Sequence, residues 1–230
     1  DPLIKNNKDI TWMALWETNR GCPFSCSFCD WGSATLSKIY KFDMDRIYKE
    51  LEWFADNEIE YVYCCDANFG ILKRDIDIIK KTIEIRNKTG FPKRMSVFNT
   101  KNATERAYIV QKLLSDSGLH KGVDIAFQSL DHNTLDNIKR SNISISSFFD
   151  LQKRYAQDGV QTYSELIMGL PGETYDTFVE GYTSLIKNGQ HNRIRCSPLT
   201  VLPNAEMADP EYINKYKLET VEARATNAHG

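Results

Sequence analysis

The sequence has no long apolar run and no strong excess of charge of either sign. Among its 230 residues, 29 Lys and Arg stand against 31 Asp and Glu, so the net charge is −2. No apolar stretch approaches the length of about 20 residues that a membrane helix needs. A balanced charge gives no overall basic surface for nucleic acid or anionic lipid. We therefore expect neither a membrane nor a nucleic acid among the partners of this chain.

Several common catalytic patterns are also missing. The four His residues show no pairing that suggests acid–base chemistry, and the sequence contains neither a phosphate-binding loop nor a nucleophile elbow. No secretory segment is visible, so the six Cys residues are expected to be reduced thiols rather than disulfides. These features predict a cytoplasmic protein in which thiolates are available as ligands.

The most informative segment is the loop at residues 21–32, which holds three cysteines in the pattern C-x3-C-x2-C. Cys22, Cys26 and Cys29 follow an apolar run at residues 12–16. Thiolates on so short a tether can converge on one metal centre, and cysteine is the usual ligand of iron–sulfur clusters. Three ligands leave one iron of a four-iron cluster without a protein ligand and free to bind a small molecule. The spacing therefore favours an open [4Fe–4S] cluster.

Other interpretations of these cysteines stay open. They could supply three of four zinc ligands or belong to a closed cluster, although no second C-x2-C or H-x3-H pair follows. They could also be structural thiols. Cys64, Cys65 and Cys196 could complete a site but lack the spacing of a metal knuckle. Cys64 and Cys65 are better explained as packed thiols, because free cysteine is usually buried.

Short β-type runs alternate with amphipathic helical segments along most of the chain. The expected strands are residues 11–16, 60–65, 94–98, 123–127, 160–168 and 193–199. Helices are expected after the caps Asp43, Thr104 and Thr174 and from Asp75, Thr134 and Ser144, with Gly90 ending the second one. Six strands alternating with helices predict a parallel α/β sheet. The period alone does not distinguish an open doubly wound sheet from a barrel.

Polar residues gather where these strands end, which is the edge at which parallel α/β folds bind ligands. They are Asp66, Asn68, Asn99, Gln128 and, within the fifth strand, Glu165. Asp66 and Asn68 could instead cap a loop, and Gln128 could be a satisfied polar strand end. The gathering of polar residues at one edge supports the open-cluster interpretation independently of the cysteine spacing.

The run WETNRGCPFSCSFCDWG at residues 16–32 resembles the radical S-adenosylmethionine (SAM) enzymes, in which an aromatic residue precedes the last cysteine. It looks like the branch of that family that often carries a cobalamin-binding domain before the radical SAM core. The resemblance covers most of the chain and implies a (β/α)6 partial TIM barrel that is open at one side. It also implies a linker at residues 1–10 after a missing N-terminal domain, a radical SAM core at residues 11–205 and a C-terminal extension at residues 206–230.

The resemblance also implies which residues bind the cofactors. Phe28 would lie against the adenine of SAM, and Gln128 and Glu165 would contact its ribose and methionine parts. Arg140 would hold the SAM carboxylate, because a guanidinium offers a planar fork to a carboxylate. A solvated Arg at the end of a helix is the alternative for Arg140.

At the end of the second strand the chain departs from the family pattern. The family often has Gly-Gly-Glu there to bind the amino group of SAM, whereas this chain has Cys64-Cys65-Asp66. Asp66, Asn68 and Asn99 remain the candidate SAM contacts at the ends of the second and third strands. The exact pattern of donors and acceptors is therefore expected to differ from that of the family.

The cofactors implied by the resemblance are a [4Fe–4S] cluster on Cys22, Cys26 and Cys29, SAM, and cobalamin bound through a domain outside this chain. The implied reaction is reductive cleavage of SAM to a 5′-deoxyadenosyl radical, used for methylation of an unactivated carbon or phosphorus. A radical SAM enzyme without cobalamin, performing oxidation or rearrangement, is one alternative. A non-enzymatic iron–sulfur or zinc module is another. The expected partners are a small-molecule substrate and a reductant such as flavodoxin or ferredoxin.

Overall fold

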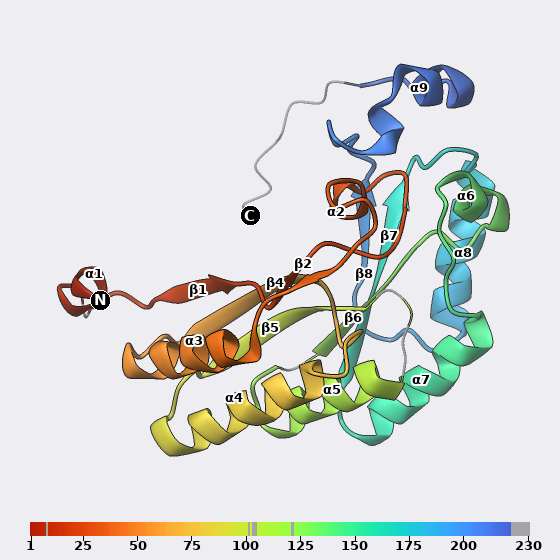
Figure 1. Ribbon diagram of the computed structural model, residues 1–230. Helices are drawn as coiled ribbons and strands as arrows, with labels where there is room; N and C mark the ends of the chain where they lie inside the picture. The colour runs from red at the N-terminus through yellow and green to blue at the C-terminus, as the bar shows by residue number, and fades with distance from the viewer. Residues whose placement is uncertain (8, 101, 103–104, 121, 222–230) are drawn as a thin grey trace.

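We describe a computed structural model of residues 1–7, 9–100, 102, 105–120 and 122–221. Two three-stranded parallel sheets form the centre of the fold (Figure 1). The first sheet has the order β1-β4-β5, with β1 at Met13–Trp16, β4 at Tyr61–Phe69 and β5 at Arg94–Asn99. The second has the order β6-β7-β8, with β6 at Gly122–Gln128, β7 at Gln161–Met168 and β8 at Ile194–Pro198. β2 (Asn19–Arg20) and β3 (Tyr40–Lys41) form a short antiparallel pair.

Helices connect the strands in the alternation expected from the sequence. They are α1 (Pro2–Lys5), α2 (Asp30–Ser33), α3 (Met44–Asp56), α4 (Asp75–Thr89), α5 (Glu105–Asp116), α6 (His132–Asn137), α7 (Ile145–Gln157), α8 (Tyr175–Lys187), the 3₁₀ turn η1 (Glu206–Ala208) and α9 (Pro210–Tyr216). Figure 1 shows α3, α4, α5 and α7 on one side of the sheets, and α9 near the opposite end of the molecule.

Three predicted helix ends are confirmed. The side chain of Asp43 accepts hydrogen bonds at the start of α3, Thr174 forms a capping box at the start of α8, and Gly90 ends α4 in the left-handed conformation. Thr104, the predicted cap of α5, lies outside the described residues. The predicted start of α6 at Thr134 is wrong by two residues, because Asp131 is the cap and its carboxylate accepts the Thr134 N–H at 2.7 Å.

β4 is longer than predicted. Residues 66–68, which were expected to follow the strand, lie inside it, because the ladder with β5 continues across a register shift to the pair Phe69 and Asn99. Conversely, β1 begins at Met13 rather than at residue 11. Both differences arise because pairing with a neighbouring strand, rather than local composition, decides where a strand ends.

The sheets do not close into a barrel. Within the described residues β5 and β6 form no ladder, although the Met95 N–H reaches the Leu119 carbonyl at 3.0 Å just before β6. The chain is thus an α/β protein with two parallel sheets that follow one another. The six strands in sequence order match the prediction, whereas one continuous sheet is not present.

Three apolar clusters hold these layers together. The first packs α3, α4 and α5 against the first sheet through residues such as Ile47, Ile78 and Val62, each with no exposed surface. The second joins the second sheet to α7 and α8, with Phe148 at its centre. The third is made by Leu135, Ile138, Leu170, Met207 and Tyr212, and it attaches the C-terminal segment to the core. Burial of a large side chain of this kind contributes about 1.5–3 kcal/mol.

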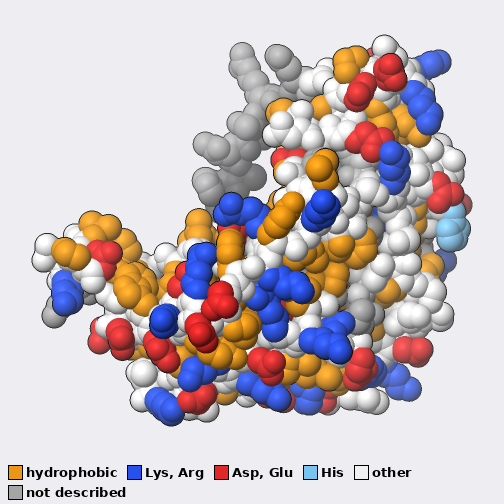
Figure 2. All heavy atoms as spheres, in the orientation of Figure 1, with side chains coloured by type: hydrophobic (Ala, Val, Ile, Leu, Met, Phe, Trp, Pro, Cys, Tyr) orange, Lys and Arg blue, Asp and Glu red, His pale blue; other side chains and the backbone are white. Residues whose placement is uncertain are grey.

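The other face of the first sheet is more exposed and rich in aromatic side chains. Along β4 the fully buried residues Val62 and Cys64 alternate with the half-buried Tyr61 and Tyr63, as the two-residue period of a strand requires. Within the described residues no helix is long and apolar enough to cross a membrane. On the face drawn in Figure 2, basic and acidic side chains are interspersed over the helices.

Candidate cofactor site

The cysteine loop is the segment of residues 21–39 between β2 and β3. The pairs Asn19–Lys41 and Arg20–Tyr40 join its two ends. Inside the loop the backbone is tightly folded, because a Cβ on Gly32 would lie 2.0 Å from the Phe24 carbonyl oxygen. Any side chain at position 32 would push the loop apart. The sequence analysis did not predict this hairpin, because each of its strands has only two residues.

A buried carboxylate holds the first end of the loop. Asp66 Oδ1 accepts the backbone N–H groups of Thr18 at 2.7 Å and Asn19 at 3.1 Å. Its Oδ2 accepts the Thr18 hydroxyl and the Asn19 side-chain amide. Only 1% of Asp66 is exposed, and this burial raises its pKa although the hydrogen bonds oppose the rise. These contacts match the alternative in which Asp66 fixes a neighbouring loop, and contact with SAM remains a prediction.

A cation from α4 holds both ends of the loop together. The guanidinium of Arg74 donates through Nη2 to the Thr18 carbonyl and through Nη1 to the Phe42 carbonyl. The next residue, Asp75, is fully buried, and its Oδ2 accepts the Gly70 N–H at 2.8 Å and the Leu72 N–H at 2.9 Å. The cysteine loop and the loop after β4 are therefore tied to the start of one helix.

The C-terminal segment holds the middle of the cysteine loop. Ser27 donates its backbone N–H to the Ile138 carbonyl at 3.0 Å and accepts the Met207 N–H at 2.8 Å. The Ser27 hydroxyl lies 2.9 Å from the Tyr212 hydroxyl, which also donates to the Asn137 carbonyl at 2.9 Å. Residues 206–216, expected to belong to an extension, are thus part of the support of the cysteine loop.

The three predicted cluster ligands lie on the same loop next to one buried cation. Cys22 is buried, and Cys26 and Cys29 are half-buried. Burial raises the pKa of Cys29, and the neighbouring thiols of Cys26 and Cys22 add to the rise. Burial lowers the pKa of Arg140, and the same three thiols partly oppose this fall. The structure therefore brings three thiols and a guanidinium together.

In the part of the chain that the structure describes, the thiols of the cysteine loop do not form a ready-made site for a single metal ion. Tetrahedral zinc sites at about 2.3 Å per Zn–S bond require ligand sulfurs within about 4 Å of one another. Among the described residues, no group of three His, Cys, Asp or Glu side chains is close enough to hold one metal ion. A four-iron cluster binds its cysteines at separate corners and does not need such close approach.

Asn68 is brought directly to the cysteine loop. Its side-chain Nδ2 lies 3.1 Å from Cys22 Sγ, and both residues are buried. An amide N–H so close to a thiolate sulfur donates a hydrogen bond to it. Asn68 therefore contacts a predicted cluster ligand, and its contact with SAM stays a prediction.

Arg140 is not a solvated residue at a helix end. It is only 8% exposed, and its Nε donates to the Phe127 carbonyl at 3.2 Å and to Asn142 Oδ1 at 2.8 Å. Its Nη2 donates to the Ala126 carbonyl, and Nη1 lies 4.0 Å from Cys26 Sγ. The guanidinium edge that carries Nη1 is therefore the part directed at the cysteine loop.

A local irregularity in β6 makes room for Arg140. The ladder between β6 and β7 shifts register between Ala126 and Gln128, and Gln128 has a positive φ of 68°. Such a conformation is uncommon outside glycine and is frequent near functional sites. Because the ladder is interrupted here, the carbonyls of Ala126 and Phe127 accept hydrogen bonds from the buried guanidinium. Gln128 is half-buried at this strand end, and its contact with SAM remains a prediction.

The remaining predicted SAM contacts have different surroundings. Phe28 packs against the third apolar cluster. Asn99 is the last residue of β5, and among the described residues its buried Oδ1 has no hydrogen-bond partner. Glu165 forms an ion pair of 3.2 Å with Arg195 on β8. An unpaired buried acceptor such as Asn99 Oδ1 fits a donor group on a bound ligand, whereas Glu165 already has a partner.

The other cysteines are located away from the cysteine loop. Cys64 has no exposed surface and belongs to the first apolar cluster, and this burial raises its pKa well above the ordinary value. Cys65 lies on the opposite face of β4, and Cys196 packs against the second cluster. The interpretation of Cys64 as a packed thiol is confirmed.

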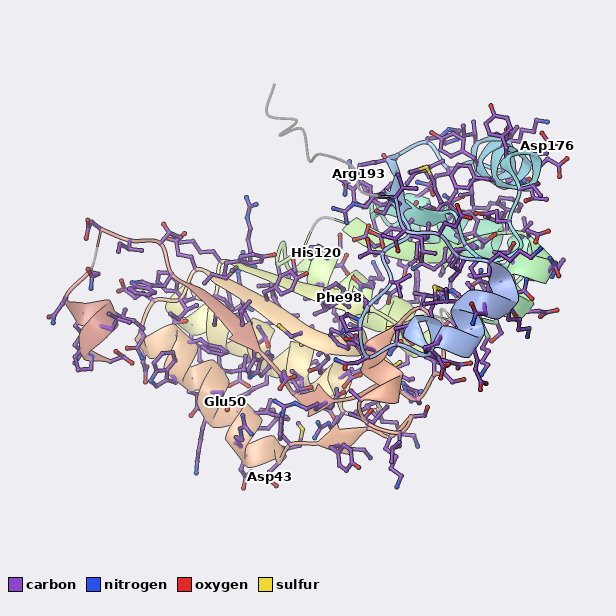
Figure 3. The ribbon with its side chains drawn as sticks, turned by 90° about the horizontal axis from the view of Figure 1, so that it is seen from above. Asp43, Glu50, Phe98, His120, Asp176 and Arg193 are labelled. Atoms are coloured by element: carbon purple, nitrogen blue, oxygen red, sulfur yellow. The ribbon has the colours of Figure 1, made fainter. Side chains whose placement is uncertain are left out.

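Aromatic side chains form a wall beside the cysteine loop. The ring of Trp31, two residues after Cys29, lies 6.0 Å from that of Phe98 on β5. Phe98 in turn lies 5.5 Å from Tyr63 on β4, and both pairs meet edge to face. Figure 3 shows Phe98 between the two halves of the fold, with Arg193 on the half that contains β8.

The supports of the loop were missed by sequence reasoning. Arg74 and Tyr212 are far in sequence from the cysteine loop and belong to no motif. Thr18 lies inside the run at residues 16–32, but nothing in that run indicates that it binds Asp66. Asp75 was predicted only as the start of a helix. No periodicity or spacing in the sequence indicates these contacts, because each depends on the packing of separate elements.

Comparison with known proteins gives consistent matches. The sequence pattern of the radical SAM superfamily matches residues 16–185. The chain is 44% identical over 217 residues to the cobalamin-dependent radical SAM methyltransferase TokK of Streptomyces tokunonensis, covering 94% of this chain and 32% of that protein. It is 45% identical over 217 residues to the 2-(S-pantetheinyl)-carbapenam-3-carboxylate methyltransferase of Streptantibioticus cattleyicolor, with the same two coverages. This chain thus spans about a third of the length of these relatives.

Solved structures show the same fold. The radical SAM methyltransferase TsrM of Kitasatospora setae, with tryptophan substrate and a SAM analog bound, superposes with a TM-score of 0.70 at 17% identity. The match covers 85% of this chain and 38% of that one. Coproporphyrinogen III oxidase HemN of Escherichia coli matches with a TM-score of 0.64 at 13% identity, over 93% of this chain and 54% of that one. Both likenesses concern the parallel α/β core.

Proposed function

Because the chain belongs to the radical SAM superfamily, we propose that it is the cluster-binding core of a cobalamin-dependent methyltransferase. The observation that carries this proposal is the loop in which Cys22, Cys26 and Cys29 lie beside Asn68 and Arg140. Two relatives that match 94% of the chain at 44% and 45% identity are methyltransferases, and one of them is cobalamin-dependent.

The residues present fit the implied cofactors. Cys22, Cys26 and Cys29 would hold a [4Fe–4S] cluster and leave one iron for SAM. When bound, the reduced cluster supplies the electron that cleaves SAM to methionine and a 5′-deoxyadenosyl radical, and cobalamin supplies the methyl group. Arg140 Nη1, on the edge of the guanidinium nearest to Cys26, would donate a charge-assisted hydrogen bond to the SAM carboxylate. Asn99 Oδ1, which has no partner among the described residues, would accept a hydrogen bond from the same ligand.

Aromatic residues of this chain would also shield the space beside the cysteine loop in which the radical forms. The aromatic wall of Trp31, Phe98 and Tyr63 borders the cysteine loop with apolar surface. A primary carbon radical attacks the nearest C–H bond, so excluding water and mobile groups from this space favours the intended substrate. Asp66 and Arg74 keep the loop in position.

We propose that the substrate is a small molecule methylated at an unactivated carbon, with phosphorus as the other acceptor type of this branch. The name of one relative contains a carbapenam carboxylate, which favours carbon. The corrin would bind to polypeptide outside these residues, and the electron would come from a low-potential reductant such as flavodoxin or ferredoxin. In the complete protein, the two parallel sheets would together form the (β/α)6 partial barrel of the family.

The proposal is tested by anaerobic purification and reconstitution of the chain. We expect brown absorbance, about four iron per chain and 5′-deoxyadenosine formed from SAM after reduction with dithionite. Cys26→Ala should abolish both the absorbance and the nucleoside. Zinc in place of iron, or cleavage that survives in Cys26→Ala, would contradict the cluster assignment. Cobalamin dependence is tested separately with the longer protein, expressed with cobalamin. Purification of that protein without corrin would contradict the methyltransferase part and leave radical SAM chemistry intact.

A further inference from the structure

The contact between Asn68 and Cys22 joins a strand end to a predicted cluster ligand. The distance from Asn68 Nδ2 to Cys22 Sγ is 3.1 Å, which is short for a hydrogen bond to sulfur. Asn68 is 6% exposed and Cys22 is 8% exposed, so water does not compete strongly for either group. A hydrogen bond in such a low-dielectric environment is stronger than the same bond in water.

The two residues that follow Asn68 are held in place. Phe69, the next residue, has no exposed surface and pairs with Asn99 in the ladder between β4 and β5. Gly70 follows with its N–H bound by the buried carboxylate of Asp75. Because Asn68 is buried and the backbone after it is held, its side chain has little freedom left to lose when its amide contacts the sulfur.

A donor directed at a ligand sulfur affects the two redox states of a cluster differently. Reduction adds one negative charge, part of which lies on the cysteine sulfurs. An N–H···S bond therefore stabilises the reduced state more than the oxidised state and raises the reduction potential. An amide does this without carrying a charge of its own. Arg140 Nη1, at 4.0 Å from Cys26 Sγ, is farther from its sulfur and forms the weaker contact.

We propose that Asn68 sets the reduction potential of the cluster by donating a hydrogen bond to the sulfur of Cys22. This role rests on the proposed function, since it requires a cluster on the three cysteines. It differs from the expected contact of Asn68 with SAM, because it acts in the absence of SAM. Asn68 would make the cluster easier to reduce by a biological donor, and the strength of this effect does not depend on the substrate.

The test is a redox titration of the anaerobically reconstituted chain without SAM, followed by the electron paramagnetic resonance signal of the reduced cluster. Asn68→Leu keeps the size of the side chain and removes the donor. We expect its equilibrium constant for reduction to fall at least threefold, about 30 mV at 59 mV per tenfold change for one electron. Asn188→Leu is the matched control, because within the described residues the side chain of Asn188 donates to Ser184, at the end of α8. Its potential should equal that of the unaltered chain.

A second measurement, made first on the unaltered chain, does not require that Asn68→Leu retains its cluster. Resonance Raman bands of the Fe–S(Cys) bonds should shift when the protein is exchanged into D2O, and the shift should be absent in Asn68→Ser, whose shorter side chain does not reach the sulfur. Equal potentials for Asn68→Leu and the control would overturn the proposal. If Asn68→Leu does not retain a cluster, the Raman experiment decides, and bands that do not move in D2O overturn it.

These outcomes are separate from a failure of the proposed function. If the unaltered chain binds no iron, the proposed function fails before any potential is measured. If it binds a four-iron cluster and cleaves SAM, but Asn68→Leu has an unchanged potential, only the role of Asn68 is removed. A lowered potential with normal SAM affinity would support the proposed role and contradict the expected SAM contact of this residue.

Discussion

Replacement of Asp66 distinguishes support of the cysteine loop from direct contact with SAM. Its two oxygens accept four hydrogen bonds from Thr18 and Asn19, the residues that lead into the loop. Asp66→Ala removes both acceptor oxygens and all four hydrogen bonds. Asp66→Asn removes the charge but keeps one oxygen for the two backbone N–H groups. The Thr18 hydroxyl and the Asn19 amide can rotate and form hydrogen bonds with the new amide.

The magnitudes follow from the number of buried groups that lose a partner. Each buried N–H without an acceptor costs about 1–3 kcal/mol. The two backbone N–H groups cannot turn to another partner, so Asp66→Ala should lower the free energy of unfolding by about 2–6 kcal/mol. Release of a buried carboxylate, whose pKa is raised by burial, places the result toward the lower end. Asp66→Asn should cost only about 1 kcal/mol, the value of one ordinary hydrogen bond.

The assay has two parts. Urea unfolding of the cluster-free chain gives the stability, and equilibrium binding of SAM to the reconstituted chain gives the affinity. We expect Asp66→Asn to keep its SAM affinity and Asp66→Ala to lose cluster content as well as stability. The exposed Asp45→Asn serves as a control and should change stability by less than about 0.5 kcal/mol. A loss of SAM affinity of about tenfold or more in Asp66→Asn, with stability unchanged, would refute our reasoning and assign Asp66 to the SAM amino group.

Three further substitutions test the surroundings of the loop. Arg140→Ala should weaken SAM binding by about 1.5–3 kcal/mol through loss of a charged hydrogen bond. If a calorimetric titration shows unchanged affinity, Arg140 does not bind SAM and its role is limited to its contacts with backbone carbonyls. Burial raises the pKa of Asp75 from its ordinary 3.8 to about 6, so the folded chain binds this proton more tightly than the unfolded chain, and stability falls as pH rises from about 4 to 6. Asp75→Asn should remove a pH-dependent part of about 3 kcal/mol from urea unfolding curves, and an unaltered pH profile would contradict this. Tyr212→Phe, which removes the hydroxyl between Ser27 and Asn137, should cost about 1–2 kcal/mol in the same assay; no loss would show that these bonds contribute nothing net.

Much of the fold follows from local signals in the sequence. Helix caps at Asp43 and Thr174 and the end at Gly90 depend on residues a few positions apart, and the structure confirms them. The alternation of strands and helices is likewise a local periodic signal. Closure of the sheet is not local. The interruption between β5 and β6 depends on how two halves of the chain meet, and the period gives no information about it.

The candidate site likewise has one part that the sequence predicts and another that only the structure shows. The spacing of Cys22, Cys26 and Cys29 indicated the cluster loop, because three ligands within eight residues leave few other geometries. The roles of the polar residues at the strand ends required the structure. A strand directs alternate side chains to opposite faces, so the face that Asp66 shares with Cys64 follows from the register of β4 and not from its position near a strand end.

The sequence by itself therefore determined the type of cofactor loop, the order of the elements and the end of the sheet at which polar groups gather. Only the tertiary structure decided that Asp66 and Arg74 hold the loop, that Arg140 is buried and that Asn68 meets a cysteine sulfur. Spacing within a loop is fixed by covalent connection, whereas these contacts join residues dozens of positions apart. They exist only after packing has brought the elements together and excluded water between them.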